Sequence, residues 1–496
     1  MANFGYDKIV STLRNNYREG NLYEYGKRLE QLQALYRLVE ENEGELLEAL
    51  HKDLGKCKTE GRIMETMIVM RECGETIQYL KTWMKPESVK PDLLNSLYAC
   101  KIIREPLGVV LIMGAWNYPV QLTLLPLIGA LAAGNCAILK PSELSPHSAQ
   151  VMTKLVQKYM DPDFVRIVNG AIPETTELLK QRFDKIFFTG SPSVGKIIMK
   201  AASEYLTPVD LELGGKCPAI VDESCNFDAI GNRIAWAKLA NAGQTCLAVD
   251  YIICVGNCRD KLIESLKKSI ESFYGEDQQE SDSYGRILNK RHVARLQKLI
   301  DPSKVVYGNK VDEDDLYISP TIMKDVSPDD PVMQDEIFGP ILPVLTVKNI
   351  DEAIRYVQER EKPLALYIFS NVQKTIDRIL KMTSSGSVCV NDAVVQGAVP
   401  TLPFGGVGNS GMGAYHGHFS YDAFSHRKAC IIKDQRLEFL NKIRYPPYVF
   451  DWKPLNWIVW LLVPKGRPSS SWSSWLGLAL LGIVIGFVYN FVLNKQ

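Results

Sequence analysis

Residues 107–140 read LGVVLIMGAWNYPVQLTLLPLIGALAAGNCAILK, and this stretch decides the fold. It begins with a continuous apolar run, 107–116, which is typical of a strand buried on both faces of a parallel sheet. A helical pattern follows, and residues 136–140 (CAILK) indicate a second strand. Because parallel strands need a crossover between them, the stretch predicts a β-α-β unit of an α/β domain.

The alternation of strands and helices continues on both sides of this unit. Residues 1–90 show mainly helical spacing, and residues 185–191 (KIFFTGS) predict a third strand, followed by helical SVGKIIMKAASEYL. A second series of strands begins near Lys216 and contains CPAIVD, YIICVG, LPVLTV, LALYIFS and GSVCVND. A chain of 496 residues is too long for one ordinary core. We therefore expect two α/β domains.

Charge and cysteine content exclude several classes of protein. Lys plus Arg and Asp plus Glu both number 57, and no long basic run occurs, so we expect no nucleic-acid partner. The 11 cysteines are an odd number scattered along the chain, which is not the pattern of a disulfide framework. No Cys-His spacing resembles a zinc site, so no metal is predicted. The N-terminus lacks the apolar segment of a secretory signal peptide.

The C-terminal region differs from the rest. Residues 475–493 (WLGLALLGIVIGFVYNFVL) are 19 residues without a formal charge, close to the roughly 20 that a membrane-spanning helix needs. We interpret 472–493 as a tail anchor, with a buried core helix as the alternative. Lys465 and Arg467 precede it and Lys495 follows, which places the main body in the cytosol.

A second apolar segment lies just before the predicted anchor. Residues 454–464 (PLNWIVWLLVP) are too few to span a bilayer, but a Trp-rich apolar segment suits the membrane interface. Such a segment would hold a substrate entrance against the membrane. Packing onto the protein's own surface explains it equally well.

Polar residues follow the ends of three predicted strands, where ligands bind in open parallel sheets. Asn117 follows the first strand. Lys140 and Glu143 lie in the turn after the second, and Gly190 and Ser191 follow the third. Together these three strand ends would form a cofactor crevice.

The third of these turns resembles a nucleotide-binding loop. Residues 187–197 (FFTGSPSVGKI) almost match the P-loop pattern, but Ile197 replaces the hydroxyl residue that ligates Mg²⁺. Gly190 permits a tight turn, and a helix N-terminus presents free N–H groups, so the turn can hold a phosphate without Mg²⁺. An ordinary strand–helix loop remains an equally good interpretation.

Cys246, Glu212 and Glu336 could carry chemistry. Cys246 lies in LANAGQTCLA, just beyond a turn, where a nucleophile can be exposed; a buried structural cysteine is the alternative. Glu212 lies in apolar LELGGK, where desolvation would raise its pKa toward that of a general base; a salt-bridged or capping Glu is the alternative. Glu336 lies in QDEIFGP, where the alternative is a solvated loop acid.

The motifs GAWNYP, ILKPSE, FFTGSPSVG, LELGGK, NAGQTC, EIFGP and PFGGVGNSG occur in an order and spacing that resemble the aldehyde dehydrogenase superfamily. The likeness covers roughly residues 5–440. The short N-terminus and the apolar C-terminal tail look most like the membrane-anchored fatty aldehyde dehydrogenase branch. That branch oxidises medium- and long-chain aliphatic aldehydes with NAD.

The resemblance implies a role for each site residue. Cys246 matches the catalytic nucleophile, and Asn117 with the Cys246 backbone N–H matches the oxyanion hole. Glu212 matches the base that activates water to hydrolyse the thioester intermediate. The remaining matches are to the cofactor site: Glu336 at the nicotinamide ribose, Phe338 beside the cofactor, Lys140 and Glu143 at the adenosine ribose, Gly190 and Ser191 near the pyrophosphate, and Gly195 in the following helix.

The resemblance also implies the architecture. We expect a Rossmann-type cofactor domain, an α/β catalytic domain, a small bridging or oligomerisation sheet and a C-terminal transmembrane helix. The boundaries are 1–84 and 106–212 for the NAD-binding domain, 213–393 for the catalytic domain, 85–105 and 394–445 for the bridging region, 446–471 for a membrane-proximal segment and 472–493 for the anchor. ACKIIRE and KACIIK are expected to pair as strands in a homodimer-forming region.

NAD is the expected cofactor, with NADP less favoured, because Glu143 would accept a hydrogen bond from the ribose 2′-OH and repel a 2′-phosphate. The resemblance places the anchor in the endoplasmic reticulum. Three alternatives stay open: an acylating dehydrogenase that passes the thioester to coenzyme A, a thiol hydrolase and a catalytically inactive membrane scaffold.

Overall fold

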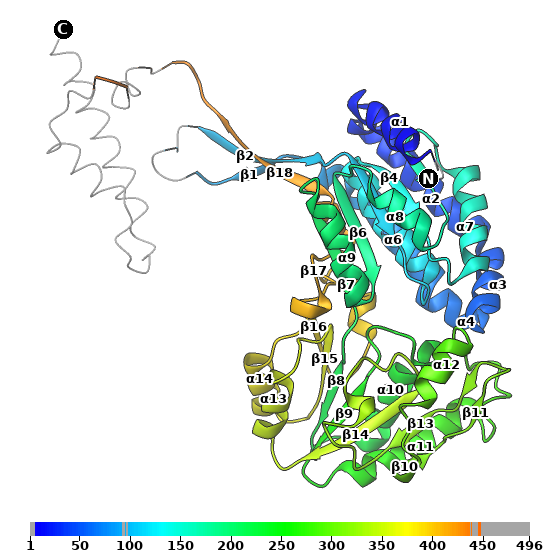
Figure 1. Cartoon of the computed structure of the whole chain (residues 1–496). Helices are drawn as coiled ribbons and strands as arrows, with labels where there is room; N and C mark the ends of the chain where they lie inside the picture. The colour runs from blue at the N-terminus through cyan, green and yellow to red at the C-terminus, as the bar shows by residue number, and fades with distance from the viewer. Residues whose placement is uncertain (1–4, 92–94, 96–97, 437, 439–444, 448–496) are drawn as a thin grey trace, which may run out of the picture. The chain divides into compact units, whose positions relative to one another are not determined.

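The computed structural model describes residues 5–91, 95, 98–436, 438 and 445–447. The described residues form two compact units (Figure 1). The first contains 5–84 and 106–425, and the second contains those of 85–105 and 426–447. Residues 394–425, which the sequence assigned to the bridging region, thus make their contacts in the first unit.

The first sheet of the larger unit contains the β-α-β unit predicted from residues 107–140. It has six strands in the order β17-β7-β6-β3-β4-β5, all parallel except β17. Their bounds are β3 Val109–Met113, β4 Cys136–Lys140, β5 Val165–Ile167, β6 Lys185–Gly190, β7 Val209–Leu213 and β17 Gly411–Met412. The three predicted strand ends therefore lie on the neighbouring strands β6, β3 and β4.

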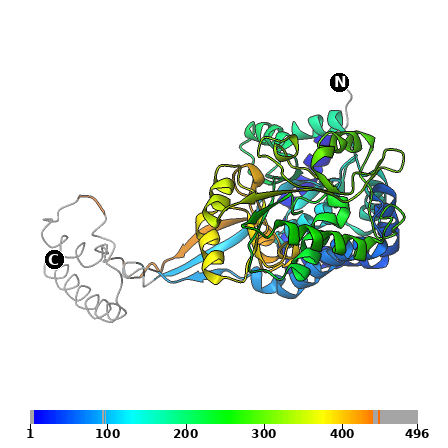
Figure 2. The ribbon, with the colours of Figure 1, turned by 90° about the horizontal axis from the view of Figure 1, so that it is seen from below.

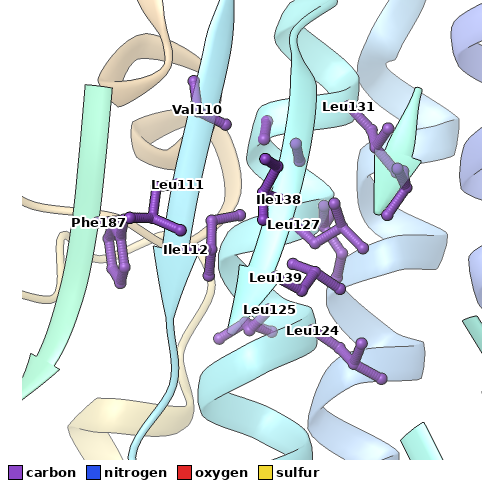
Figure 3. Packing of buried hydrophobic residues seen from close by; sticks show 14 of the residues in the cluster. Val110, Leu111, Ile112, Leu124, Leu125, Leu127, Leu131, Ile138, Leu139 and Phe187 are labelled. Carbon is purple, nitrogen blue, oxygen red and sulfur yellow. The ribbon is translucent and has the colours of Figure 1, made fainter. Parts of the chain in front are cut away.

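Helices cover this sheet. Their bounds are α1 Tyr6–Arg18, α2 Tyr25–Glu41, α3 Glu43–Leu54, α4 Lys58–Gly61, α5 Met67–Trp83, α6 Pro119–Ala133, α7 Pro146–Tyr159, α8 Ile172–Leu179, α9 Pro192–Ser203 and α15 Gly417–Ala423, with a π-helical turn, Arg62–Thr66, between α4 and α5. Helix α6 is apolar on all sides and almost completely buried, as its composition requires. Its Leu127 and Leu131 pack near Ile138 and Leu139 of β4 (Figure 3).

A second sheet, built by residues 218–390, lies in the same unit. It has seven strands in the order β10-β13-β14-β9-β8-β15-β16, parallel except β10. The bounds are β8 Pro218–Val221, β9 Tyr251–Val255, β10 Val305–Tyr307, β13 Thr321–Met323, β14 Ile341–Val347, β15 Ala365–Phe369 and β16 Ser387–Val390, with α10 Phe227–Leu239, α11 Arg259–Tyr274, α12 Lys290–Gln297, α13 Ile350–Gln358 and α14 Gln373–Met382. A separate pair, β11 Val311–Asp312 and β12 Tyr317–Ile318, is antiparallel.

The predicted α/β fold with two Rossmann-like sheets is confirmed. Within the larger unit, helices such as α6, α9 and α13 pack against strands of the two sheets (Figures 1 and 2). Each sheet has its own hydrophobic core, since the buried residues form two separate clusters. The active-site residues predicted from the sequence come from both sheets and the loops between them.

The smaller unit contains a three-stranded sheet in the order β1-β2-β18. The bounds are β1 Glu87–Val89, β2 Ala99–Pro106 and β18 Ser425–Ile432. The predicted pairing of ACKIIRE with KACIIK is confirmed, because these segments form the adjacent strands β2 and β18. An ion pair between Arg104 and Glu87 (3.2 Å) links β2 to β1. The bridging or dimer-forming role of this sheet stays a prediction.

The described part of the chain holds no helix that combines the length and the apolar character needed to cross a bilayer. The predicted anchor, 472–493, and the interfacial segment, 454–464, lie outside the described residues. Of the membrane-proximal segment 446–471, only residues 446 and 447 are described.

Candidate active site

Asn117 lies in the loop between β3 and α6 and is 4% exposed. Its side-chain Nδ2 donates a hydrogen bond to the Gln244 carbonyl (3.1 Å), in the loop that carries Cys246. Its own carbonyl accepts from Lys56 Nζ (2.8 Å) and from Asn241 Nδ2 (2.9 Å). The structure thus ties the predicted oxyanion residue directly to the predicted nucleophile's loop.

A buried ion pair between Lys56 and Glu65 supports the loop that carries Asn117. Lys56 Nζ lies 2.6 Å from Glu65 Oε1, and neither side chain is exposed to solvent. Glu65 Oε2 accepts from the backbone N–H groups of Val120 (2.9 Å) and Gln121 (3.3 Å), at the start of α6. A carboxylate at a helix N-terminus satisfies orphan donors and offsets their partial positive charge. Sequence reasoning missed this pair, because 56 and 65 follow no motif and meet only through the fold.

The backbone before Cys246 is strained. Asn241, Ala242 and Gly243 have φ values of 56°, 52° and 76°, all in the left-handed region. For residues other than glycine this costs on the order of 1–3 kcal/mol each. At Gly243 a Cβ would lie 2.3 Å from the Gly339 carbonyl oxygen, so a side chain has no space there. The glycine of NAGQTC therefore lets the nucleophile loop pass against the backbone of the EIFGP motif.

Hydrogen bonds hold the strained segment in place. The Asn241 N–H donates to Glu60 Oε1 (2.8 Å). Gln244 Nε2 donates to the Arg286 carbonyl (2.9 Å), and Gln244 Oε1 accepts from the Leu288 N–H (2.9 Å). The Gln of NAGQTC is thus a brace between the nucleophile loop and the segment before α12. This specific role could not be derived from the motif alone.

Cys246 lines a cavity of about 240 Å³. Most of its other lining residues are aliphatic or aromatic, among them Ile63, Met67, Leu122, Trp236 and Phe404. Burial raises the pKa of the Cys246 thiol to about 12, and the nearby Glu336 and Glu212 carboxylates add to the shift. Without substrate and cofactor the thiol is therefore protonated at neutral pH.

Glu212 is the fourth residue of β7 and is 4% exposed. Neither of its carboxylate oxygens has a hydrogen-bond partner among the described residues. Burial raises its pKa well above the usual value, and the charge of Asp210 raises it further. The structure brings Glu212 close enough to Cys246 for its charge to raise the thiol pKa. A salt-bridged or capping Glu, the alternative from sequence, is wrong.

Glu336 lies against the turn that follows β7. A Cβ on Gly214 would lie 2.0 Å from Glu336 Oε2, so the carboxylate packs directly on that backbone. Burial and then the charge of Asp250 raise the Glu336 pKa to about 8. Glu336 is half-buried, and its carboxylate packs against this turn rather than being fully solvated.

Phe338 lies two residues further on, with a φ of 51°. Its ring makes an edge-on contact with Trp116, with the ring centroids 5.3 Å apart. Trp116 also contacts His292 (5.5 Å between centroids), and burial lowers the pKa of His292 to about 4. Sequence reasoning missed His292, which lies in α12 far from any motif. Together these rings form an aromatic cluster beside the end of β3.

The predicted adenosine-side residues lie at the carboxyl ends of β4 and β6. Lys140 Nζ forms an ion pair with Glu143 Oε2 (3.0 Å). Ser191 caps α9, with its Oγ accepting from the Val194 N–H (3.4 Å). Gly195 in α9 is so close to β7 that a Cβ would lie 2.9 Å from Leu213 Cδ2. The G-x-x-x-x-G-K match is coincidental, because residues 192–195, which would form the phosphate-cradling loop, already lie within α9.

The structure therefore gathers the predicted residues into two groups. Asn117, Cys246, Glu212 and Glu336 converge where the two sheets meet. Lys140, Glu143, Gly190, Ser191 and Gly195 lie along the carboxyl edge of the first sheet, beyond neighbouring strands, which is where an open parallel sheet binds a dinucleotide. The roles of all these residues stay predictions.

We expect Lys56→Met to lower the free energy of unfolding by about 3–5 kcal/mol, because it leaves Glu65 buried and unpaired. The double variant Lys56→Met/Glu65→Leu should lose less, since no charge remains buried. Urea denaturation measures both.

Lys154→Met is the matched control, because it breaks an exposed pair with Glu45 (2.8 Å) and should cost less than about 1 kcal/mol. A Lys56→Met variant no less stable than Lys154→Met would contradict this reading of the ion pair.

Comparison with known proteins identifies the family. Residues 5–430 match the model of the aldehyde dehydrogenase family. The mouse protein "aldehyde dehydrogenase, dimeric NADP-preferring" is 49% identical over 439 residues, which are 88% of this chain and 97% of that protein. "Aldehyde dehydrogenase family 3 member A2" of Macaca fascicularis is 45% identical over 484 residues, which are 98% and 99% of the two chains.

Among solved structures, the substrate-bound state of Staphylococcus aureus AldH is similar to this fold, with a TM-score of 0.89. It is 42% identical and covers 91% of this chain and 98% of its own. Sequence match, fold and the convergence of the motif residues agree. The chain belongs to the aldehyde dehydrogenase family and is an oxidoreductase of that family.

Proposed function

We propose that this enzyme oxidises medium- and long-chain aliphatic aldehydes to carboxylic acids with NAD, through a thiohemiacetal and a thioester on Cys246. The observation that carries the proposal is the cavity beside Cys246, whose lining is mainly apolar. An alkyl chain gains about 0.8 kcal/mol for each CH₂ that leaves water. Polar or charged aldehydes would gain nothing from most of this surface.

Cys246 supplies the nucleophile. The thiol first gives up its proton to solvent; the thiolate Sγ then adds to the carbonyl carbon, and the carbonyl oxygen becomes an alkoxide. The Asn117 amide has two N–H donors, of which one is used on the Gln244 carbonyl. The other, with the Cys246 backbone N–H, stabilises the alkoxide, and a donor of this kind contributes roughly 3–4 kcal/mol in comparable sites.

The site fits a dinucleotide. Ser191 caps α9 at the end of β6, Gly195 leaves no space between α9 and β7, and the Lys140–Glu143 pair lies at the end of β4. Glu336 and Phe338 would hold the nicotinamide half, and Glu143 the adenosine ribose. When bound, the nicotinamide accepts the hydride that leaves the substrate carbon.

Glu212 acts in the second half of the reaction. Its raised pKa makes it a stronger base than an exposed carboxylate. It removes a proton from water, the water oxygen attacks the thioester carbon, and the C–S bond breaks to free the carboxylic acid and the thiol. An acylating enzyme that passes the thioester to coenzyme A would need no such base.

A series of unbranched aldehydes tests the proposal by NADH formation. We expect kcat/KM to rise by up to about fourfold per added CH₂ until the cavity is filled. Cys246→Ala should abolish turnover, whereas Glu212→Gln should give one burst of NADH per site and then stop.

The control reactions are run with coenzyme A and without NAD. Flat chain-length dependence, acyl-coenzyme A as product, or ester hydrolysis as the sole activity of the NAD-free enzyme would each sink the proposal.

The preference for NAD rests on Glu143, whose carboxylate would repel a ribose 2′-phosphate. Lys140 lies 3.0 Å from that carboxylate and reduces the repulsion without removing it. The mouse relative at 49% identity is named NADP-preferring, so the preference has to be measured on this chain.

We expect a higher kcat/KM with NAD than with NADP. Glu143→Gln should lower the ratio of kcat/KM with NAD to kcat/KM with NADP by about tenfold, because it removes roughly one repulsive contact between like charges. Glu264→Gln is the matched control, because Glu264 forms an exposed pair of the same i,i+3 type with Lys267 on α11 (2.8 Å). Wild-type enzyme that uses NADP as well as NAD would refute the preference.

The cellular part of the proposal rests on the sequence. The chain is a homodimer anchored by 472–493 in the endoplasmic reticulum membrane, with the catalytic unit in the cytosol. The segment 454–464 holds the substrate entrance at the bilayer, where long aldehydes partition.

Two truncations separate anchoring from substrate delivery. Ending the chain after Ser471 should release the protein from the membrane fraction. Ending it after Lys453 should additionally lower kcat/KM for long aldehydes more than for short ones. Full-length protein that stays out of the membrane fraction contradicts the anchor, and equal losses for both substrates contradict the entrance role.

A further inference from the structure

Glu212 shares its face of the first sheet with two other charged residues. Side chains two positions apart on a strand point to the same side, so Asp210 and Glu212 lie on one face of β7. The parallel register pairs Phe187 of β6 with Asp210 and Thr189 with Glu212. Lys185 therefore lies on this face as well, next to Asp210.

Asp210 is an almost completely buried carboxyl group, whose pKa is raised by burial and lowered again in part by Lys185. Its Oδ2 lies 2.7 Å from Lys185 Nζ, with side-chain exposures of 9% and 8%. The segment after β17 covers the carboxylate closely, because a Cβ on Gly413 would lie 2.5 Å from Asp210 Oδ1. Gly413 also has a φ of 91°, which a residue with a side chain rarely adopts. Gly413 therefore lets the segment after β17 pack directly against the Asp210 carboxylate.

The titratable groups around Glu212 come from several elements. Asp210 faces it from β7, and Lys185 lies behind Asp210 on β6. Cys246 faces it from the nucleophile loop. Tyr415 faces it from the segment after β17, and its pKa is raised well above the usual value by burial and by the charge of Glu212.

Two further carboxylates, Glu336 and Glu72, act on neighbours of Glu212. The charge of Glu336 raises the pKa of Cys246, and the charge of Glu72 raises that of Tyr415. Glu72 itself lies 3.2 Å from the His416 imidazole and accepts from the Gly417 N–H. Within the described residues, the charged group on Glu212's own strand is thus the anion Asp210, and no hydrogen bond holds the Glu212 carboxylate.

We propose that Asp210 is a positioning residue for the reaction: a second carboxylate that, with Lys185 as its counter-ion, sets how strongly Glu212 holds a proton. The inference rests on the proposed role of Glu212 as the base of thioester hydrolysis. Asp210 does not contact the reacting atoms and acts through Glu212 alone.

The physical reason is charge repulsion at short range in a dry site. When Glu212 takes the proton from water, two neighbouring anions become one anion and one neutral carboxyl group. Residues two apart on a strand are separated by roughly 7 Å, which is close enough for two buried charges to repel each other. Lys185 cancels part of this repulsion, and the remainder raises the pKa of Glu212.

The test is the pH profile of thioester hydrolysis after the NADH burst, measured on the full chain between about pH 5 and pH 9. Asp210→Asn removes the like charge, so the pKa of Glu212 falls and the base is ionised at lower pH. The acid limb should move down by about one pH unit, and the alkaline plateau should fall because the base is weaker.

The double variant Asp210→Asn/Lys185→Gln separates charge from packing. It replaces the ion pair by a neutral pair of similar size, which also guards against a single variant that fails to fold. Its acid limb should move in the same direction but less far, since the single variant leaves an unpaired cation on this face. Loss of packing alone would lower the stability of the protein and leave the acid limb and the alkaline plateau of the pH profile unchanged.

Asp184→Asn is the matched control. Asp184 pairs with Arg14 (2.7 Å) just before β6, five residues along the chain from Thr189 and thus roughly 16 Å from Glu212 along the strand direction. This variant should change stability without moving the limb. Equal movement of the limb in Asp184→Asn would overturn the inference.

Glu212→Gln distinguishes the two levels of the proposal. If it retains the wild-type hydrolysis and acid limb, the proposed role of Glu212 is wrong and the inference falls with it. If it stops hydrolysis while Asp210→Asn and the double variant keep the wild-type limb, the role of Glu212 stands and the inference about Asp210 is overturned.

Discussion

The buried ion pair between Lys56 and Glu65 is the interaction on which the site depends. Taking two charges fully out of water costs several kcal/mol for each ion, so such a pair persists only where further hydrogen bonds satisfy both partners. Glu65 accepts from the first N–H groups of α6, and Lys56 donates to the Asn117 carbonyl. Lys56 Nζ also lies 3.9 Å from the centroid of the Tyr118 ring. The pair thereby fixes where β3 ends and α6 begins.

Further hydrogen bonds connect this ion pair to the loop that carries the nucleophile. Asn117 Nδ2 donates to the Gln244 carbonyl, and the Asn117 carbonyl accepts from Asn241 Nδ2. Tyr118 Oη lies 2.7 Å from Thr245 Oγ1. The loop is left-handed at consecutive residues, a conformation that a free peptide would leave. It persists because the hydrogen bond that Asn241 donates to Glu60, the hydrogen bond that Gln244 donates to the Arg286 carbonyl and the close contact at Gly243 all hold it in place.

The pKa values of the groups in the site are raised because these groups are buried away from water. Burial is the first cause of the raised pKa of Cys246, of Glu212 and of Glu336, and each negative charge then raises the pKa of its neighbours. Each of these three groups therefore holds its proton more tightly than it would in water. The same conditions make each proton transfer sensitive to one more buried charge such as Asp210.

The sequence by itself determined the α/β class, both series of strands and the candidate residues. Apolar runs such as 107–116 are long enough to be read locally, and the motifs lie in order along the chain. It could not find Lys56, Glu65, His292 or the Lys185–Asp210 pair, because their partners are distant in sequence and follow no period. It left a solvated loop acid open as the alternative for Glu336, since burial of a loop acid depends on what packs over it, and the structure makes this residue half-buried. Periodicity reports which face of an element is apolar, whereas desolvation and charge pairing depend on which elements meet. The apolar run around Glu212 already predicted its desolvation, whereas only the tertiary structure decided which charges face Glu212 and Cys246.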